Sequence, residues 1–211
     1  MSEAVHTTEL LINRILACRS ANKRCLVGIA GAPGSGKSTL AADLAGGLAE
    51  AGAQAQVVPM DGFHLDNTIL IERDLLDRKG APETFDFKGF HRLARALAND
   101  TDVYYPVFDR SRDIAIAGKG RVGPECSIVL LEGNYLLLDE PGWRELAPLW
   151  DLSIRLQVPL ATLRARLINR WLAYGLDQTA AQARAEGNDM ANATRIQTTA
   201  LPADLEFSSD A

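Results

Sequence analysis

The sequence predicts an α/β protein with a mainly parallel sheet. Apolar runs with strand character alternate with helical segments along the chain, and this order is typical of right-handed βαβ units. One glycine-rich run, residues 31–38, stands directly between an apolar strand and a helix. The length of 211 residues, without a linker or an internal repeat, favours one domain over 1–211 around a single large core.

The first half of the chain is expected to alternate between helix and strand. Leu11, Ile15 and Cys18 recur at helical spacing, which predicts an amphipathic helix over about 6–20. The apolar run 25–30 predicts the first buried strand. The elements expected next are a helix from the glycine-rich loop to about 51, a strand at 55–59, and helical segments at 67–77 and 88–99.

The second half continues the alternation and ends in a different kind of helix. A β-prone, aromatic run at 103–108 leads into a highly charged loop at 109–113. Leu160, Leu163, Leu167 and Trp171 form an apolar stripe at three- and four-residue steps, which marks a helix. The other elements expected here are strands at 127–131 and 152–158 and a helical segment at 178–192 that is rich in Ala, Gln and Arg.

Composition narrows the classes of protein. The content of 47% hydrophobic and 23% charged residues is ordinary for a globular protein. A net charge of −5 argues against a dedicated nucleic-acid binder. The three cysteines, Cys18, Cys25 and Cys126, are widely spaced and predict neither a disulfide framework nor a zinc site. No apolar run is long enough to span a bilayer, so we expect a cytoplasmic protein without membrane insertion.

The run 31–38 reads G-x-x-x-x-G-K-S, the phosphate-binding loop of nucleoside-triphosphate enzymes. Its backbone N–H groups and the positive end of the next helix would attract phosphate. Lys37 would reach the β- and γ-phosphates, and the Ser38 hydroxyl would bind Mg²⁺. The alternative is a glycine-rich turn that matches by chance. The residues expected to bind ATP are Gly31, Ala32, Pro33, Gly34, Ser35, Gly36, Lys37, Ser38 and Thr39.

Acidic residues follow two other predicted strands. Because parallel strands place ligands at their carboxyl ends, Asp61 and Glu132 are expected to converge on the phosphate loop. Asp61 would accept a proton from an attacking hydroxyl, or it is only the turn residue of an Asp-Gly pair. Glu132 would serve Mg²⁺ or its water shell, or it caps a helix.

Phosphoryl transfer also requires cations around the transferred group. Arg166 and Arg170 lie four residues apart on one side of the helix that begins at residue 160, whereas Arg164 points elsewhere. We consider this pair as lid arginines that stabilise the transition state. A solvated helix face is the alternative.

Five segments together resemble a known group, the superfamily of uridine kinase, phosphoribulokinase and bacterial pantothenate kinase. Besides the phosphate loop, they are Met-Asp-Gly-Phe-His at 60–64, the segment 78–86, Tyr-Pro-Val-Phe-Asp at 105–109 and Leu-Glu-Gly-Asn-Tyr at 131–135, in the family's order. The resemblance runs from about Cys25 to Arg170. Within the superfamily, the chain is most similar to bacterial kinases encoded with fructose-type sugar transporters.

The resemblance implies a P-loop kinase fold, a three-layer α/β sandwich with a five-stranded, mainly parallel sheet and a helical lid over about 164–192. It also implies that Asp61 is the catalytic base, that Glu132 serves the metal site and that the lid arginines touch the triphosphate. Asp86 would hydrogen-bond acceptor hydroxyls, and the segment 108–113 would line the acceptor pocket. The residues expected to bind the acceptor are His64, Asp86, Phe108, Arg110 and Arg112.

Four positions depart from the uridine kinase pattern and bear on the acceptor. Gly62 and His64 stand where uridine kinases have Ser and an aromatic residue, and Arg110 and Asp113 stand where they have an aromatic residue and His. These departures weigh against a pocket that stacks a nucleobase, without excluding a nucleoside as acceptor. Arg110 and Arg112 would bind an anionic acceptor, or they belong to a charged surface loop.

The sequence thus favours a kinase that uses ATP and Mg²⁺ to phosphorylate a hydroxyl of a small polar metabolite. A sugar such as fructose, a nucleoside and a pantothenate-like acid remain open as acceptors, and the protein would act as a monomer or homodimer. The alternative is a nucleotide-binding switch acting on a protein partner, although the guanine-reading motif Asn-Lys-x-Asp is absent. Asn188 and Asn192 either line the pocket or cap helices.

Overall fold

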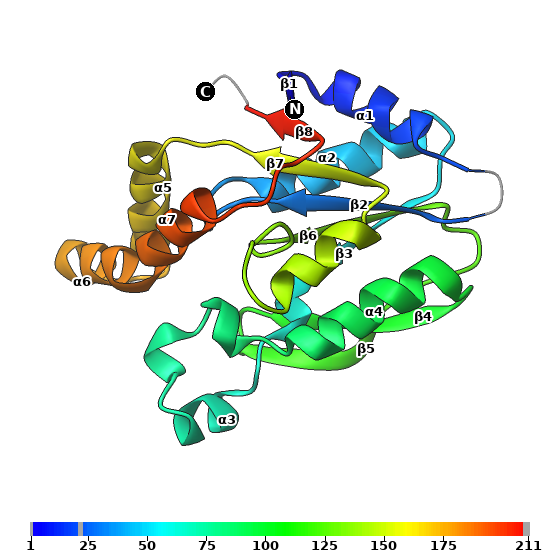
Figure 1. Ribbon diagram of the computed structural model, residues 1–211. Helices are drawn as coiled ribbons and strands as arrows, with labels where there is room; N and C mark the ends of the chain where they lie inside the picture. Colours follow the sequence, from blue (N-terminus) through cyan, green and yellow to red (C-terminus); the bar gives the residue numbers. More distant parts are fainter. Residues whose placement is uncertain (1, 21–22, 209–211) are drawn as a thin grey trace.

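The computed structural model describes residues 2–20 and 23–208 and is built on a parallel sheet of six strands in the order β1-β8-β7-β2-β6-β3 (Figure 1). Every pairing of neighbours in this sheet is parallel. The α/β class is therefore as predicted. The strands are β1 (Glu3–Val5), β2 (Cys25–Ala30), β3 (Ala55–Pro59), β6 (Ile128–Gly133), β7 (Leu152–Leu156) and β8 (Leu205–Phe207).

The prediction of five strands is wrong by one, because two edge strands are too short to show a pattern. β1 and β8 have three residues each. They pair with one another, so segments about 200 residues apart in sequence lie side by side at one edge (Figure 1). Their pairing depends on contacts between distant segments rather than on local periodicity.

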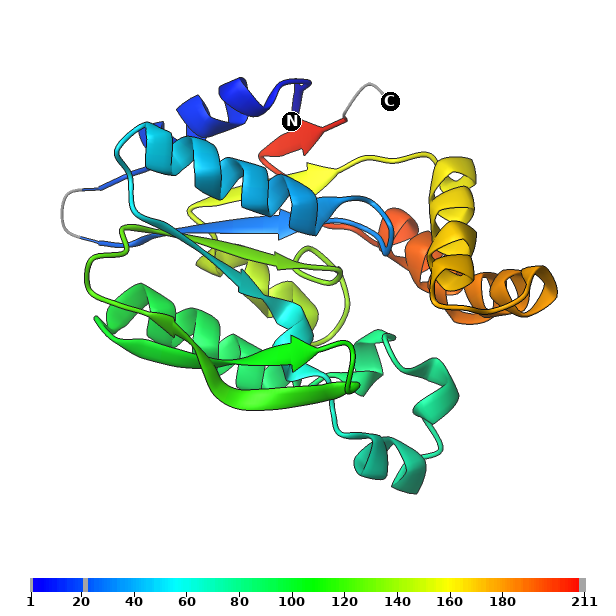
Figure 2. The ribbon, with the colours of Figure 1, turned by 180° about the vertical axis from the view of Figure 1, so that it is seen from behind.

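Helices cover both faces of the sheet. α1 (Thr8–Ala17) and α2 (Lys37–Glu50) pack on one face, and α4 (Phe87–Asn99) lies across the other (Figure 2). Successive residues of β6 alternate between the two cores: Ile128 and Leu130 pack toward α1 and α2, and Val129 and Leu131 toward α4. Burial on both faces explains why the central strands β2 and β6 are almost wholly apolar.

A second, smaller sheet lies beside α4. It is an antiparallel hairpin of β4 (Val103–Asp109) and β5 (Ile114–Val122). The sequence predicted the first of these strands but not the second, because β5 contains Gly118 and Gly120 and only one of its residues, Val122, is buried. The Tyr105 hydroxyl bonds the carbonyl of Val57 at 3.1 Å, which fastens the hairpin to β3.

The remaining helices project from the carboxyl ends of the strands (Figures 1 and 2). Leu163 and Leu167 pack with Met190 and Ala193 in a small separate core. The predicted lid region, about 164–192, falls on this projecting part. Its elements are α5 (Leu160–Ala173), α6 (Gln178–Arg184), a π-helical segment (Ala185–Asp189) and α7 (Met190–Thr198). The short helix α3 (Asn67–Glu72) lies apart from them, on the side of the β4–β5 hairpin (Figure 1).

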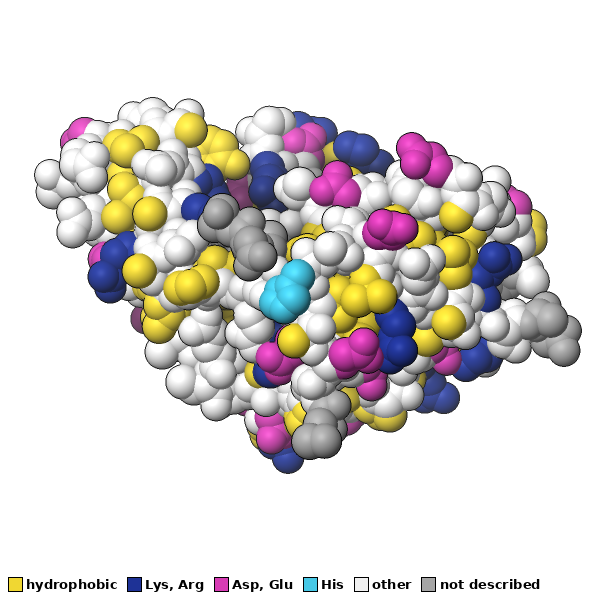
Figure 3. All heavy atoms as spheres, turned by 90° about the horizontal axis from the view of Figure 1, so that it is seen from above, with side chains coloured by type: hydrophobic (Ala, Val, Ile, Leu, Met, Phe, Trp, Pro, Cys, Tyr) yellow, Lys and Arg dark blue, Asp and Glu magenta, His cyan; other side chains and the backbone are white. Residues whose placement is uncertain are grey.

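The core holds free thiols, and the surface carries charges of both signs (Figure 3). Cys25 and Cys126 are buried, as expected of core residues, and Cys18 is also a free thiol. Among the described residues, no helix has the length and apolar character needed to cross a membrane. On the face shown in Figure 3, acidic and basic side chains are interspersed with hydrophobic ones.

Candidate active site

The carboxyl ends of β2, β3 and β6 open into a cleft of about 810 Å³. Since these strands are neighbours in the sheet, the phosphate loop and Asp61 meet in the cleft, and Glu132 lies buried just behind its lining, bonded to Ser38. The sequence predicted this convergence of strand ends. The 3₁₀ turn Met60–Phe63, directly after β3, carries Asp61. The lid and the β4–β5 hairpin supply further walls, through Arg166 and Arg170 on one side and Phe108 and Arg110 on the other.

The phosphate loop has the backbone that its glycines allow. Gly34 and Gly36 adopt φ values of 79° and 92°, in the left-handed region that side-chain-bearing residues avoid. α2 begins at Lys37, immediately after Gly36, so the positive end of this 14-residue helix faces the cleft. Lys37 and Ser38 both line the cleft. This arrangement suits an anionic phosphate chain.

Ser38 and Glu132 form a pair that fits a divalent cation. The Ser38 hydroxyl donates to Glu132 Oε1 at 3.2 Å, while Glu132 Oε2 is buried with no hydrogen-bond partner among the described residues. Burial raises the pKa of Glu132, and the Lys37 charge opposes that rise. Two hard oxygen ligands beside a phosphate site suit Mg²⁺, because water and phosphate oxygens supply most of the ligands of this ion. The described residues hold no cluster of three or more metal-ligating His, Cys, Asp or Glu side chains.

Asp61 is held as a carboxylate by its neighbours. Burial alone would raise the pKa of Asp61, but the charges of Lys37 and Arg110 hold it below its usual range. Arg110 Nη2 donates to Asp61 Oδ2 at 2.9 Å. The side chain of Asp61 is 22% exposed and lines the cleft, so it is open to a second substrate. Asp61 is also a turn residue, because its carbonyl accepts from the N–H of His64 at 3.2 Å.

His64 and Phe108 form an aromatic wall of the cleft. The His64 ring lies 4.1 Å from the ring of Phe85 and 4.8 Å from that of Phe108. Burial lowers the pKa of His64 to about 4, so the ring is neutral near pH 7. A neutral imidazole can still donate or accept a hydrogen bond from a hydroxyl-bearing ligand.

Lys79 and Asp113 also line the cleft. Asp113 ends the segment 108–113 that the resemblance placed at the acceptor pocket, whereas the sequence alone predicted no role for Lys79. Lys79 Nζ donates to Asn67 Oδ1 at 2.7 Å, bonds Asp113 Oδ1 at 2.8 Å and lies 5.1 Å from the centre of the Phe108 ring. The motif 78–86 contained Lys79, but only the folded chain shows that α3 and the hairpin meet at its ammonium group. Through Lys79, this cluster joins α3 to the turn of the β4–β5 hairpin at the wall of the cleft.

The lid arginines face the cleft as their spacing suggested. Arg166 Nη1 donates to the carbonyls of Gly34 and Ser35 at 3.4 and 3.3 Å, and Arg170 lines the same cleft. Arg164 instead pairs with Glu186 at 2.7 Å, on the lid. Two guanidinium groups thus stand over the phosphate loop.

Other predicted site residues lie elsewhere. Asp86 is absent from the lining of the cleft, and its Oδ1 accepts from the N–H of Gly89 at 2.8 Å as the N-cap of α4. Arg112 is also outside that lining. Asn192 lines the cleft, and its Nδ2 donates to Asn188 Oδ1 at 3.2 Å; Asn188 donates to the carbonyl of Lys79 at 2.8 Å. These two asparagines link the lid to the segment that carries Lys79.

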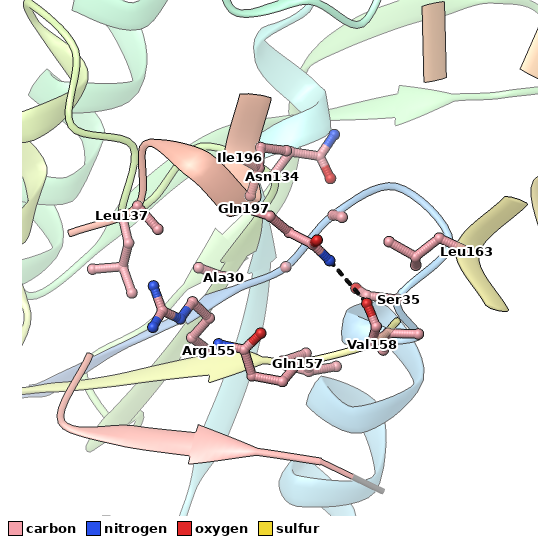
Figure 4. A pocket seen from close by; sticks show the side chains of 14 residues that line it. Ala30, Ser35, Asn134, Leu137, Arg155, Gln157, Val158, Leu163, Ile196 and Gln197 are labelled. Carbon is pink, nitrogen blue, oxygen red and sulfur yellow. Dashed lines mark hydrogen bonds between the residues drawn. The ribbon is translucent and has the colours of Figure 1, made fainter. Parts of the chain in front are cut away.

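A second, much smaller cavity of about 60 Å³ lies behind the phosphate loop (Figure 4). Asn134 and Arg155 line it, together with Gly31, Ala32 and Ser35. Gly31, Ala32 and Ser35 were predicted to bind ATP, but they face this cavity and are absent from the lining of the cleft. The lining of the cavity mixes polar side chains with a larger number of apolar ones.

The fold and site define a P-loop kinase: a parallel α/β sheet with a phosphate loop after its central strand β2, acidic residues at the carboxyl ends of β6 and β3, and arginines on a helical lid. Comparison with known families agrees with this class. The sequence profile of the Phosphoribulokinase / Uridine kinase family matches residues 26–182, and the chain belongs to this family. Membership implies ATP as the phosphoryl donor and a small molecule as the substrate.

Similar proteins cover nearly the whole chain. The "putative uridine kinase C227.14" of Schizosaccharomyces pombe is 36% identical over 214 residues, which span 95% of this chain and 90% of that protein. The protein YggC of Escherichia coli K12 is 36% identical over 206 residues, 96% of this chain and 85% of its own. A crystal structure of a "putative fructose transport system kinase" from Silicibacter sp. TM1040 is 57% identical, with a TM-score of 0.93, over 96% of this chain and 99% of that one.

Proposed function

We propose that this chain is an ATP-dependent kinase that transfers the γ-phosphoryl group to a hydroxyl of a small polar metabolite. One observation carries the proposal: a single cleft brings the phosphate loop together with Asp61, a half-buried carboxylate, and with side chains of the β4–β5 hairpin beyond it. The acceptors considered from the sequence are a sugar such as fructose, a nucleoside and a pantothenate-like acid. The name of the Silicibacter neighbour refers to a fructose transport system and does not name the phosphoryl acceptor.

Asp61 is the residue we assign as base. As a carboxylate it is ready to accept a proton, and it lies at the border between the phosphate loop and the acceptor wall. The acceptor O–H bond breaks with its proton passing to Asp61, and the oxygen forms a bond to the γ-phosphorus. The bond from that phosphorus to the β–γ bridging oxygen breaks, and ADP leaves with its electron pair.

The cations of the cleft stabilise this transfer. Lys37 reaches the phosphates from the start of α2, and Arg166 and Arg170 approach from the lid, so charge on the equatorial oxygens is balanced from two sides. Ser38 and Glu132 would hold Mg²⁺, which when bound neutralises the negative charge of the phosphates. We propose that the lid and the sheet work together as one domain, with the lid excluding water from the cleft.

The substitution Asp61→Asn tests this assignment. We expect ATP to bind with nearly the wild-type Kd, while kcat falls by roughly 100- to 10,000-fold, because the base is lost and the phosphate loop is intact. The measurements are ATP binding by calorimetry and ADP release in a coupled assay over hydroxyl-bearing metabolites, with Lys37→Ala as the blank.

Asp102→Asn is the matched control. Asp102 pairs with Arg121 at 2.8 Å on the hairpin, away from the cleft, and its loss should leave turnover unchanged. Near-wild-type turnover of Asp61→Asn on the best acceptor would overturn the assignment of the base. ATP turnover that responds to no metabolite would overturn the kinase proposal itself.

A further inference from the structure

Arg110 reaches into the acceptor side of the cleft and touches the assigned base. We propose, on the basis of the kinase function above, that the acceptor is a polyol with an acidic group, a carboxylate or a phosphate, and that Arg110 binds this group. The hydroxyl to be phosphorylated would then lie beside Asp61. This assigns Arg110 as a residue that determines which acceptors are used.

The first reason is that Arg110 has hydrogen-bonding capacity to spare. Its guanidinium group carries five N–H donors, and the bond to Asp61 Oδ2 is its side chain's one hydrogen bond among the described residues. The side chain is 62% exposed and lines the cleft. The planar fork of arginine matches a carboxylate or phosphate with two parallel hydrogen bonds.

The second reason is that the other cations near the acceptor are engaged. Lys79 is 11% exposed and is held by Asn67, Asp113 and the Phe108 ring. Arg184 lies over the Trp171 ring, 5.3 Å from its centre. On the donor side, Arg166 is bound to carbonyls of the phosphate loop. Lys37 and Arg170 also line the cleft but lie at the phosphate loop, Lys37 within it and Arg170 beside Gly34. Within the described part of the cleft, Arg110 is therefore the cation best placed to meet an acceptor.

The third reason is that the backbone of Arg110 is fixed. Asp109 Oδ1 accepts from the N–H of Ser111 at 3.1 Å, from its hydroxyl at 2.7 Å and from the N–H of Arg112 at 3.3 Å. This network holds the turn between β4 and β5 so that Arg110 points into the cleft and Arg112 lies outside its lining. Of the two arginines that the sequence offered for an anionic acceptor, the fold favours Arg110.

The rest of the acceptor wall suits hydroxyl groups rather than a second anion. Asp77 and Asp113 line it and can accept hydrogen bonds from a polyol, and the neutral His64 ring lines the same cleft beside Phe108. A neutral acceptor that covered Arg110 would leave its outer N–H groups without partners. The hydrogen bonds of a charged group are worth roughly a 10- to 100-fold change in affinity.

A matched acceptor panel tests the inference. One carbon skeleton is supplied as a neutral polyol, a carboxylate and a phosphate: glucose, gluconate and glucose 6-phosphate, and likewise glycerol, glycerate and glycerol 3-phosphate. We expect the wild type to show a kcat/KM roughly 10- to 100-fold higher for an acid form than for its neutral counterpart. Comparison of the two acid forms tells whether the acidic group is a carboxylate or a phosphate.

Arg110→Ala should bring the ratio of kcat/KM for the acid form to kcat/KM for the neutral form close to one. Because Arg110 also bonds Asp61, this ratio, and not the turnover of either form alone, is the readout. Arg121→Ala, which breaks an exposed Arg–Asp pair on the same hairpin, is the matched control and should keep the preference. A wild type that prefers neutral acceptors overturns the inference and leaves the kinase proposal standing. A preference for acid forms that survives Arg110→Ala also overturns the inference. An equal fall in kcat/KM for the acid and neutral forms would be such a result, and it would show that Arg110 acts on the base or on the phosphoryl group.

Discussion

The substitution His64→Phe should make the protein more resistant to acid. In the structure, the His64 ring is packed between Phe85 and Phe108, and its Nδ1 is buried without a hydrogen-bond partner among the described residues. Burial lowers the pKa of His64 from the ordinary 6.5 to about 4, although the negative charge of Asp61 opposes this. A phenyl ring fits the same aromatic setting and does not titrate.

The sign and size of the effect follow from proton linkage. Between pH 6.5 and about 4, the unfolded chain carries a proton on His64 that the folded chain excludes. Folded-state stability is therefore full above pH 6.5 and is lost as the pH falls through this window. With these two pKa values, the loss at pH 5 amounts to about 2 kcal/mol, and it approaches about 3.4 kcal/mol below pH 4.

Urea unfolding at pH 7.5 and pH 5.0 measures this loss. Carboxylates also titrate in this range, so the informative quantity is the difference between proteins: wild type should lose about 2 kcal/mol more than His64→Phe. Asp61, Lys79, Arg110 and Asp113, the charged groups that face the ring, are present in both proteins. His91→Phe, on α4 and outside the cleft, reports what a His-to-Phe change does by itself.

Equal losses for wild type and His64→Phe would refute the reasoning, because the ring would then not exclude its proton in the fold. His64→Gln provides a second non-titrating variant if the phenyl ring disturbs the hairpin. A result in which both variants remove the extra loss supports burial as the cause, since they share only the absence of the imidazole.

Two further predictions concern the metal site and the hairpin. Glu132→Gln should raise the Mg²⁺ concentration needed for half-maximal activity by roughly 10- to 100-fold, because the buried unpartnered oxygen loses its charge; an unchanged Mg²⁺ titration would contradict the metal assignment. Gly62→Ser should lower the free energy of unfolding by about 1–3 kcal/mol or more, since a Cβ there would lie 2.0 Å from the carbonyl oxygen of Pro106. Urea unfolding checks it against Gly46→Ser, whose Cβ would meet nothing within 4 Å, and equal stabilities would contradict it.

The donor half of the site could be predicted because its information is local. The phosphate loop is one continuous run, and the apolar strands before it and before Glu132 are unmistakable from their composition. Parallel strands then place both ends at one edge, without any knowledge of side-chain contacts. The same reasoning fails for β1 and β8, where three residues each carry no periodicity.

The acceptor half could not be predicted in the same way because it is assembled from single residues of separate elements. Asp86 stood in a motif that resembles acceptor-binding segments, yet its position before α4 makes it an N-cap. Lys79 stood in the same motif and lines the cleft. Motif letters alone do not distinguish the two, because the difference lies in how α3, α4 and the hairpin pack.

One close contact sets the packing of the hairpin against the turn that carries Asp61, and under the proposal above it bears on the choice of acceptor. Gly62 brings the turn that carries Asp61 against the backbone of Pro106, closer than any side chain would allow. Pro106 and Arg110 are four residues apart on one strand and its turn, so this approach also brings the Arg110 guanidinium to Asp61. A Ser at position 62, as in uridine kinases, would push the hairpin outward and separate that pair. The glycine and the arginine therefore act together, and a chain with one of them changed should differ in the acceptor it prefers and not in how it holds ATP.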